Sequence, residues 1–206
     1  MKICSKNPGN EQIDENDYCF FPVTFLDKPL TPFVKKISLN PNVLTVAGFV
    51  VTITAAFVLP YNIRLGGLLI LAGGLFDMLD GIIARVNNRA TRFGAFLDSL
   101  LDRYADAFLF LSVAWYLASK GEHNGVFLSL GTLAGAFLIS YARARAEGLG
   151  ESCSNGIMER PERIILLILA ALTGWFVPML WVMFVLTHVT VIQRAYHVWK
   201  VTGKKQ

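Results

Sequence analysis

The chain has 206 residues, of which 54% are hydrophobic and 17% charged, whereas about a quarter of the residues of an average soluble domain are charged. This composition excludes a disordered chain, and three scattered cysteines, Cys4, Cys19 and Cys153, exclude a disulfide scaffold. The net charge of +4 is small beside the apolar excess, so we expect a membrane protein without a nucleic-acid partner.

The N-terminal part of the chain divides into two segments. Residues 1–25 are polar and acidic and lack the apolar stretch of a secretory signal peptide. Residues 26–39 mix apolar side chains with Lys28, Lys35 and Lys36. This mixture predicts a juxtamembrane amphipathic helix on the membrane surface, and a solvated linker would have much the same composition. Residues 40–206 form the predicted membrane domain.

The membrane domain contains apolar stretches of the length needed to cross a bilayer, about 20 residues. These stretches cover residues 43–59, 65–84, 93–119, 125–142 and 164–193. The last is too long for one crossing, and Gly174 and Pro178 predict a break within it. Pro161 predicts the start of the fifth helix. We therefore expect an all-α membrane protein with six transmembrane helices and the N-terminal surface helix.

The basic residues support six crossings. With the N-terminus in the cytoplasm, the opposite side of the membrane carries only Arg64 and Lys120. The cytoplasmic side then carries the other lysines and arginines outside the spans, including Arg85, Arg143, Arg145, Arg160, Arg163 and Arg194. Such an excess of Lys and Arg marks the cytoplasmic side. We expect an integral protein of the cell membrane whose active site faces the cytoplasm.

Several carboxylates lie inside predicted spans, where an ionised carboxylate is costly and suggests a function. Asp77 and Asp80 are three residues apart, and Asp98 and Asp102 are four apart, so each pair shares one helix face. Both pairs lie near the ends of consecutive antiparallel helices joined by residues 86–92. Packing these faces together predicts one site of four carboxylates near the cytoplasmic side.

Four neighbouring carboxylates repel one another unless cations neutralise them. Oxygen ligands suit Mg²⁺ or Mn²⁺, and the lack of a nearby Cys or His in the sequence argues against zinc. Two divalent ions would balance the charge of four carboxylates, and pairs of metal ions recur in enzymes that transfer phosphoryl groups. Asp106 is predicted to pair with Arg103, three residues before it. A cation transporter is a remote alternative, because intramembrane acids also mark ion paths.

Small residues accompany the acids. Gly81, Ala84 and Gly94 would let a nucleotide or pyrophosphate approach the backbone, although small residues also let transmembrane helices pack closely. The interpretation as packing residues is stronger for four glycines without acidic neighbours: Gly66, Gly67, Gly73 and Gly74.

The string Asp77-x-x-Asp80-Gly81-x-x-Ala84-Arg85, then after eight residues Gly94-x-x-x-Asp98-x-x-x-Asp102, resembles the signature of the CDP-alcohol phosphotransferase family. The resemblance implies transfer of a phosphatidyl or archaetidyl group from CDP-diacylglycerol or CDP-archaeol to an alcohol, with release of CMP. It implies that all four aspartates bind metal ions and that Asp102 is also the general base. It further implies a homodimer and a nucleotide site of Asp80, Gly81, Ala84, Arg85 and Gly94.

The segments 140–147 and 159–163 look like the inositol-phosphate-using branch of that family, the phosphatidylinositol phosphate synthases. This likeness implies inositol 1-phosphate as the acceptor. Four arginines would hold its phosphate, because a guanidinium group can donate two parallel hydrogen bonds to phosphate oxygens: Arg143, Arg160, Arg163 and Arg194. The branch often has a lysine at Arg143. Two alternatives stay open: a phosphatidylglycerolphosphate synthase using glycerol 3-phosphate, and arginines that only enforce topology.

Overall fold

The computed structural model describes residues 2–3, 18–19, 41–86, 91–153 and 156–203. The predicted surface helix over residues 26–39 lies outside these ranges. The described helices are α2 (Pro41–Val58), α3 (Ile63–Val86), α4 (Arg92–Ser119), α5 (His123–Gly148), α6 (Arg160–Thr173) and α7 (Phe176–Thr202). Two short strands that the sequence did not predict, β1 (Lys2–Ile3) and β2 (Tyr18–Cys19), pair antiparallel with Lys2 opposite Cys19.

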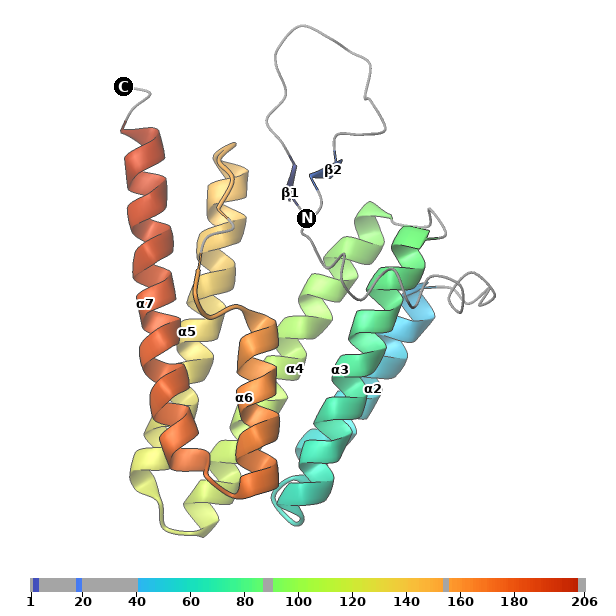
Figure 1. Cartoon of the computed structure of the whole chain (residues 1–206), viewed down its shortest axis with the longest axis vertical. Coiled ribbons are helices and arrows are strands. Elements are labelled where there is room, and N and C mark those ends of the chain that lie inside the picture. Colours follow the sequence, from blue (N-terminus) through green and yellow to red (C-terminus); the bar gives the residue numbers. More distant parts are fainter. Residues whose placement is uncertain (1, 4–17, 20–40, 87–90, 154–155, 204–206) are drawn as a thin grey trace, which may run out of the picture.

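The helices form an up-and-down bundle (Figure 1). Helix α2 packs against α3, and α5 packs against α7. Helix α4 joins the two pairs by packing against α2 and α5, while α6 packs against α3 and α7. Aliphatic side chains from all of these helices, among them Ala55, Ile70, Leu109, Leu128, Leu167 and Leu180, fill one buried core. The end of α3 and the start of α4 lie at the same end of the bundle as the ends of α5 and α7.

Four of the six helices, α2, α3, α5 and α7, are long and apolar enough to cross a membrane. Helix α4 has 28 residues but carries several charged side chains in its first half. Helix α6 has 14 residues and begins part-way along the bundle (Figure 1). At 1.5 Å per residue it is about 21 Å long, shorter than the roughly 30 Å of a hydrocarbon core. Large apolar side chains exposed on the bundle, such as Phe57, Trp115 and Trp181, suit a lipid environment.

The ends of α6 follow from local sequence. Glu159 and Glu162 form a capping box at its start, in which each side chain accepts a hydrogen bond from the backbone N–H of the other residue. Pro161 lies in the first turn, as predicted. Gly174 ends the helix in the left-handed conformation, with φ of 81°. The break predicted at Gly174 and Pro178, between the fifth and the sixth helix, is confirmed, because α6 ends at Thr173 and α7 begins at Phe176. Pro178 is the third residue of α7, where its missing N–H has no partner to lose.

Glycines bring α3 close to its neighbours. A Cβ atom added to Gly73 would overlap the Thr52 hydroxyl of α2, and one added to Gly67 would lie 2.9 Å from the Cβ of Ala171 on α6. A Cβ on Gly66 would lie 2.7 Å from the Cα of Leu59. The packing role predicted for these three glycines is confirmed. At Gly74 the nearest neighbour would be a methyl group of Ile164 at 4.0 Å, so that position has room for a side chain.

Candidate active site

Three aspartates meet where the end of α3 lies beside the start of α4. A carboxylate oxygen of Asp77, one of Asp98 and one of Asp102 all lie within 4.8 Å of one another. We call these three residues the acidic cluster. All three side chains are half-buried, so they are screened from bulk solvent yet remain reachable. The predicted convergence of the two acidic helix faces is confirmed for these residues. Their oxygen atoms are suited to a hard divalent cation.

Asp80 lies one turn beyond Asp77 and is more deeply buried, with 5% of its surface exposed. Its carboxyl group is beside the Thr45 side chain of α2. Within the described part of the chain, the buried Oδ2 of Asp80 has no hydrogen-bond partner. Burying a carboxylate oxygen without a donor is unfavourable, so this atom needs a further positive group. Together with the acidic cluster, Asp80 supplies an oxygen-rich donor set that fits a divalent metal.

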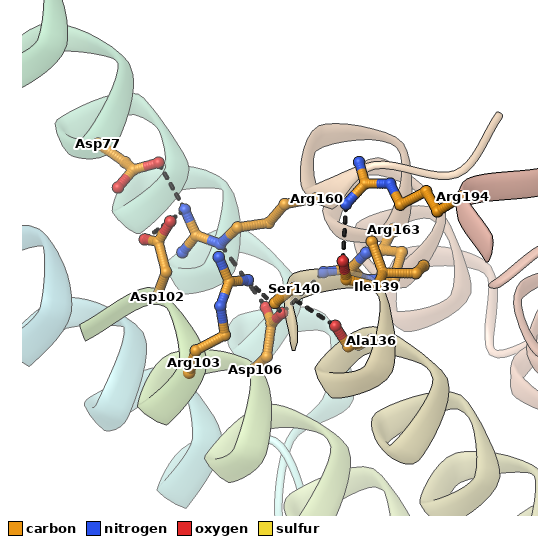
Figure 2. A network of polar contacts seen from close by, with 10 residues as sticks. All are labelled: Asp77, Asp102, Arg103, Asp106, Ala136, Ile139, Ser140, Arg160, Arg163 and Arg194. Atoms are coloured by element: carbon orange, nitrogen blue, oxygen red, sulfur yellow. Dashed lines mark hydrogen bonds and ion pairs between the residues drawn. The ribbon is translucent and has the colours of Figure 1, made fainter. Parts of the chain in front are cut away.

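Arg160, the first residue of α6, reaches into the acidic cluster (Figure 2). Its Nη1 atom lies 2.7 Å from Oδ2 of Asp77 and 2.7 Å from Oδ1 of Asp102. One guanidinium therefore links α3, α4 and α6. The sequence predicted Arg160 as a ligand of the acceptor phosphate but gave no indication of these ion pairs, because they join positions 83 residues apart in the case of Asp77.

Asp106 lies one turn beyond Asp102 on α4 and is completely buried. Its Oδ2 accepts a hydrogen bond from Nη2 of Arg163 at 2.8 Å. Nε of Arg160 lies 3.6 Å from the other oxygen, Oδ1, and Nη1 of Arg103 lies 3.9 Å from Oδ2 (Figure 2). The predicted pair with Arg103 is present, but Arg163 is the closer partner. Sequence reasoning gave Asp106 no part in the site. The sequence feature that could have indicated a buried acidic partner is the i, i+3 spacing of Arg160 and Arg163, which places both arginines on one face of α6.

The remaining predicted phosphate ligands come from α5 and α7. Arg194 is 3% exposed, and its Nη1 donates a hydrogen bond to the carbonyl oxygen of Ile139 on α5 at 2.7 Å (Figure 2). Its Nη2 lies 3.4 Å from Oε1 of Glu159, the residue before α6. Arg143 follows Ile139 by one turn of α5, and its Nε lies 2.9 Å from Oε1 of Glu147. Arg194 thus lies beside the start of α6, where Arg160 reaches the acidic cluster.

The residues predicted to line the nucleotide are only partly described. Gly81 follows Asp80 on α3 and is half-buried. Gly94 lies in the first turn of α4, where its N–H donates to the Thr91 side chain at 2.9 Å. A Cβ there would lie 2.9 Å from Oδ1 of Asn42 on α2, so close packing also requires a small residue at this position. The side chains of Ala84 and Arg85 lie outside the described residues.

Comparison with known proteins identifies similar sequences and folds. The family model for CDP-alcohol phosphatidyltransferase matches residues 38–196. The chain is 36% identical over 178 residues to an archaetidylinositol phosphate synthase of Methanothermobacter thermautotrophicus, covering 83% of this chain and 89% of that protein.

Two crystal structures of the phosphatidylinositol phosphate synthase of Mycobacterium tuberculosis have similar folds. The structure with CDP-DAG bound superposes with a TM-score of 0.75 at 32% sequence identity, covering 85% of this chain and 94% of that one. The complex with manganese and citrate gives a TM-score of 0.71 at 31% identity, covering 84% and 88%.

Proposed function

The chain belongs to the CDP-alcohol phosphatidyltransferase family, and from this membership we propose that it transfers the phosphatidyl or archaetidyl group of a CDP-linked lipid to inositol 1-phosphate, releasing CMP. The observation that carries the proposal is the acidic cluster contacted by Arg160 of α6, with Arg163 and Arg194 paired to the neighbouring acids Asp106 and Glu159. The names of the relatives, archaetidylinositol phosphate synthase and phosphatidylinositol phosphate synthase, support the choice of acceptor.

The four aspartates of α3 and α4 are the proposed metal ligands. Asp77, Asp80, Asp98 and Asp102 would hold two divalent ions, Mg²⁺ or Mn²⁺, and the orphaned oxygen of Asp80 supports its inclusion. The bound ions would neutralise the pyrophosphate of the CDP-lipid. A solved relative in complex with manganese supports the use of a divalent ion.

Asp102 is the proposed general base. The acceptor hydroxyl oxygen attacks the lipid-side phosphorus, the new P–O bond forms in line with the bond that breaks, and CMP leaves with the bridging oxygen. The hydroxyl proton passes to the Asp102 carboxylate. Asp102 lies within the acidic cluster, so a hydroxyl beside the pyrophosphate would be within its reach. The displacement is direct and requires no covalent intermediate with the protein.

The acceptor phosphate is assigned to the arginines beside the acidic cluster. Arg160 and Arg163 lie in the first turn of α6, Arg194 lies beside Glu159 just before it, and Arg143 of α5 is the fourth proposed ligand. A phosphate bound beside Arg160 would place its polyol near Asp102. Guanidinium forks bind phosphate through paired charge-assisted hydrogen bonds. The CDP moiety is assigned to the end of α3 and the start of α4, where Asp80, Gly81, Ala84, Arg85 and Gly94 would line it.

We further propose that six helices lie in the cell membrane, with α6 entering the bilayer only part-way. The charged half of α4 is compatible with this arrangement because its acids turn toward α3 and α6. The active site would face the cytoplasm, on the side where α5 and α7 end with the basic residues Arg143, Arg145, Arg194 and Lys200. Residues 26–39 would lie on the membrane surface, and two copies of the chain would form a homodimer.

The proposal is tested by an acceptor screen. Purified protein is incubated with Mg²⁺ or Mn²⁺ and either CDP-diacylglycerol or CDP-archaeol, and CMP release is measured with inositol 1-phosphate, glycerol 3-phosphate, free inositol or serine. We expect inositol 1-phosphate to give the highest kcat/KM. Preference for glycerol 3-phosphate would favour a phosphatidylglycerolphosphate synthase instead. No CMP release with any phosphorylated polyol would contradict the proposed reaction, and the Asp102→Asn variant provides the background rate.

A further inference from the structure

Arg160 already supplies a positive charge to the acidic cluster. Its Nη1 lies at the same 2.7 Å distance from an oxygen of Asp77 and an oxygen of Asp102. Those two residues are also two of the three that bring carboxylate oxygens together as candidate metal ligands. A divalent ion and a guanidinium between the same two carboxylates would repel each other strongly at such short range. The two cations therefore cannot both occupy this position.

The structure also contains a second position for the Arg160 guanidinium. Nε of Arg160 and Oδ1 of Asp106 are 3.6 Å apart, just beyond hydrogen-bond length. Both atoms are buried, and neither has a hydrogen-bond partner among the residues that the structure describes. The other oxygen of Asp106 is already bonded to Arg163. A small movement of the Arg160 side chain would satisfy both of these buried atoms at once.

We propose that Arg160 and a divalent ion compete for Asp77 and Asp102, and that ion binding moves the Arg160 guanidinium toward Asp106. This inference rests on the proposed function for the identity of the metal ligands. Without an ion, Arg160 neutralises the acidic cluster and keeps α3 and α4 together. With an ion bound, its Nη atoms are released from the carboxylates and become available to a phosphate. The acceptor site is then complete only in the metal-loaded protein.

The test measures Mn²⁺ binding to the purified full-length protein in detergent, without lipid or acceptor, from the paramagnetic resonance signal of free Mn²⁺. We expect Arg160→Gln to bind the first Mn²⁺ about tenfold more tightly than the unaltered chain, because its competitor is gone. The Mn²⁺ affinity of Arg160→Lys should lie between those of Arg160→Gln and the unaltered chain, because lysine keeps the positive charge but lacks the planar guanidinium. Arg160→Gln should also have a lower Tm without Mn²⁺ and a larger Mn²⁺-induced rise in Tm.

Arg103→Gln is the matched control. It removes a positive charge that acts on Asp98 and Asp102 at longer range, whereas among the described residues the ion pair of Arg103 is with Asp106. This variant measures the general effect of charge removal on cation affinity. The proposal requires the gain in Arg160→Gln to exceed the gain in Arg103→Gln. Equal gains, no gain, or weaker Mn²⁺ binding in Arg160→Gln would overturn it.

Asp106→Asn is expected to change the Mn²⁺ affinity in the opposite direction to Arg160→Gln. It weakens the alternative partner of Arg160, so Mn²⁺ affinity should fall relative to the unaltered chain. Unchanged or increased affinity in a folded Asp106→Asn protein would contradict the proposed movement. Should this variant not fold, the comparison of Arg160→Gln with Arg103→Gln still decides the question. An unaltered chain that binds no Mn²⁺ yet releases CMP with Mg²⁺ would refute competition for Mn²⁺ while leaving the proposed reaction intact.

Discussion

Arg163 and Asp106 form an ion pair in which both side chains are buried. Nη2 of Arg163 lies 2.8 Å from Oδ2 of Asp106, and the two side chains are 1% and 0% exposed. The pair links α6 to α4 across the interior of the bundle (Figure 2). Removing one partner of a buried pair leaves an uncompensated charge, which costs more than the intact pair contributes.

We therefore expect Arg163→Met to destabilise the fold by about 3–5 kcal/mol, because Asp106 would lose its closest partner in a buried position. Thermal unfolding in detergent measures the effect. The exposed Arg145 provides the control: Arg145→Met should change stability by no more than about 0.5 kcal/mol. A Tm for Arg163→Met equal to that of the control would mean that solvent or lipid headgroups neutralise Asp106.

Asp102→Asn should reduce turnover by about a hundredfold to ten-thousandfold, because the amide cannot accept the proton of the acceptor hydroxyl. Binding of the CDP-lipid should survive. Calorimetric titration with CDP and an assay of CMP release separate the two properties. Asp98→Asn is the companion variant, in which we expect weaker Mn²⁺ binding as the primary defect. If Asp102→Asn keeps near-normal turnover, Asp102 is not the base.

Arg143→Gln should raise the KM for the phosphorylated acceptor roughly ten- to hundredfold, as expected for the loss of a charge-assisted hydrogen bond. The KM for the CDP-lipid should stay within twofold of its original value. Steady-state kinetics with each substrate varied in turn provides the measurement. Arg145→Gln, two residues along the same helix and on a different face, should alter neither constant. Equal changes in both constants would indicate that Arg143 serves the fold or the membrane topology.

Gly73→Ala should destabilise the bundle by about 1–3 kcal/mol, because the added methyl group would meet the Thr52 hydroxyl and force α2 and α3 apart. Asp77 follows Gly73 by one turn, so Mn²⁺ affinity should fall as well. Gly74→Ala is the adjacent control, since its methyl group would meet only Ile164 at 4.0 Å. We expect Gly74→Ala to be neutral or slightly stabilising, and similar Tm values for both variants would contradict close packing at Gly73.

Local spacing was sufficient to predict the acidic cluster. Asp77, Asp98 and Asp102 converge because i, i+3 and i, i+4 positions share a helix face and because consecutive antiparallel helices bring their joined ends together. The helix boundaries at Pro161 and Gly174 were predictable for a similar reason, since capping depends on neighbouring residues. Pro178, predicted to separate two helices together with Gly174, lies in the first turn of α7, where a proline is tolerated.

The arrangement of the arginines could not be predicted from spacing. Arg160 reaches Asp77 across 83 positions, and Arg163 reaches Asp106 across 57. Both contacts depend on where α6 begins within the bundle, which is decided by the packing of α6 against α3 and α7. The sequence pattern marked Arg103 as the partner of Asp106 because the two are close along the chain, whereas the closer partner comes from another helix.

The self-capped start of α6 has a consequence for how the chain tolerates insertions. The backbone that leads into Arg160 is held by the Glu159–Glu162 capping box and by the hydrogen bond from the N–H of Met158 to Oγ1 of Thr190 on α7. Gly148 ends α5 and Gly150 follows in the connection to α6, and both have open space where a Cβ would lie. Loop length at Gly150 is therefore decoupled from the geometry of the site, and the chain can gain or lose a few residues there in the course of evolution without redirecting the guanidinium.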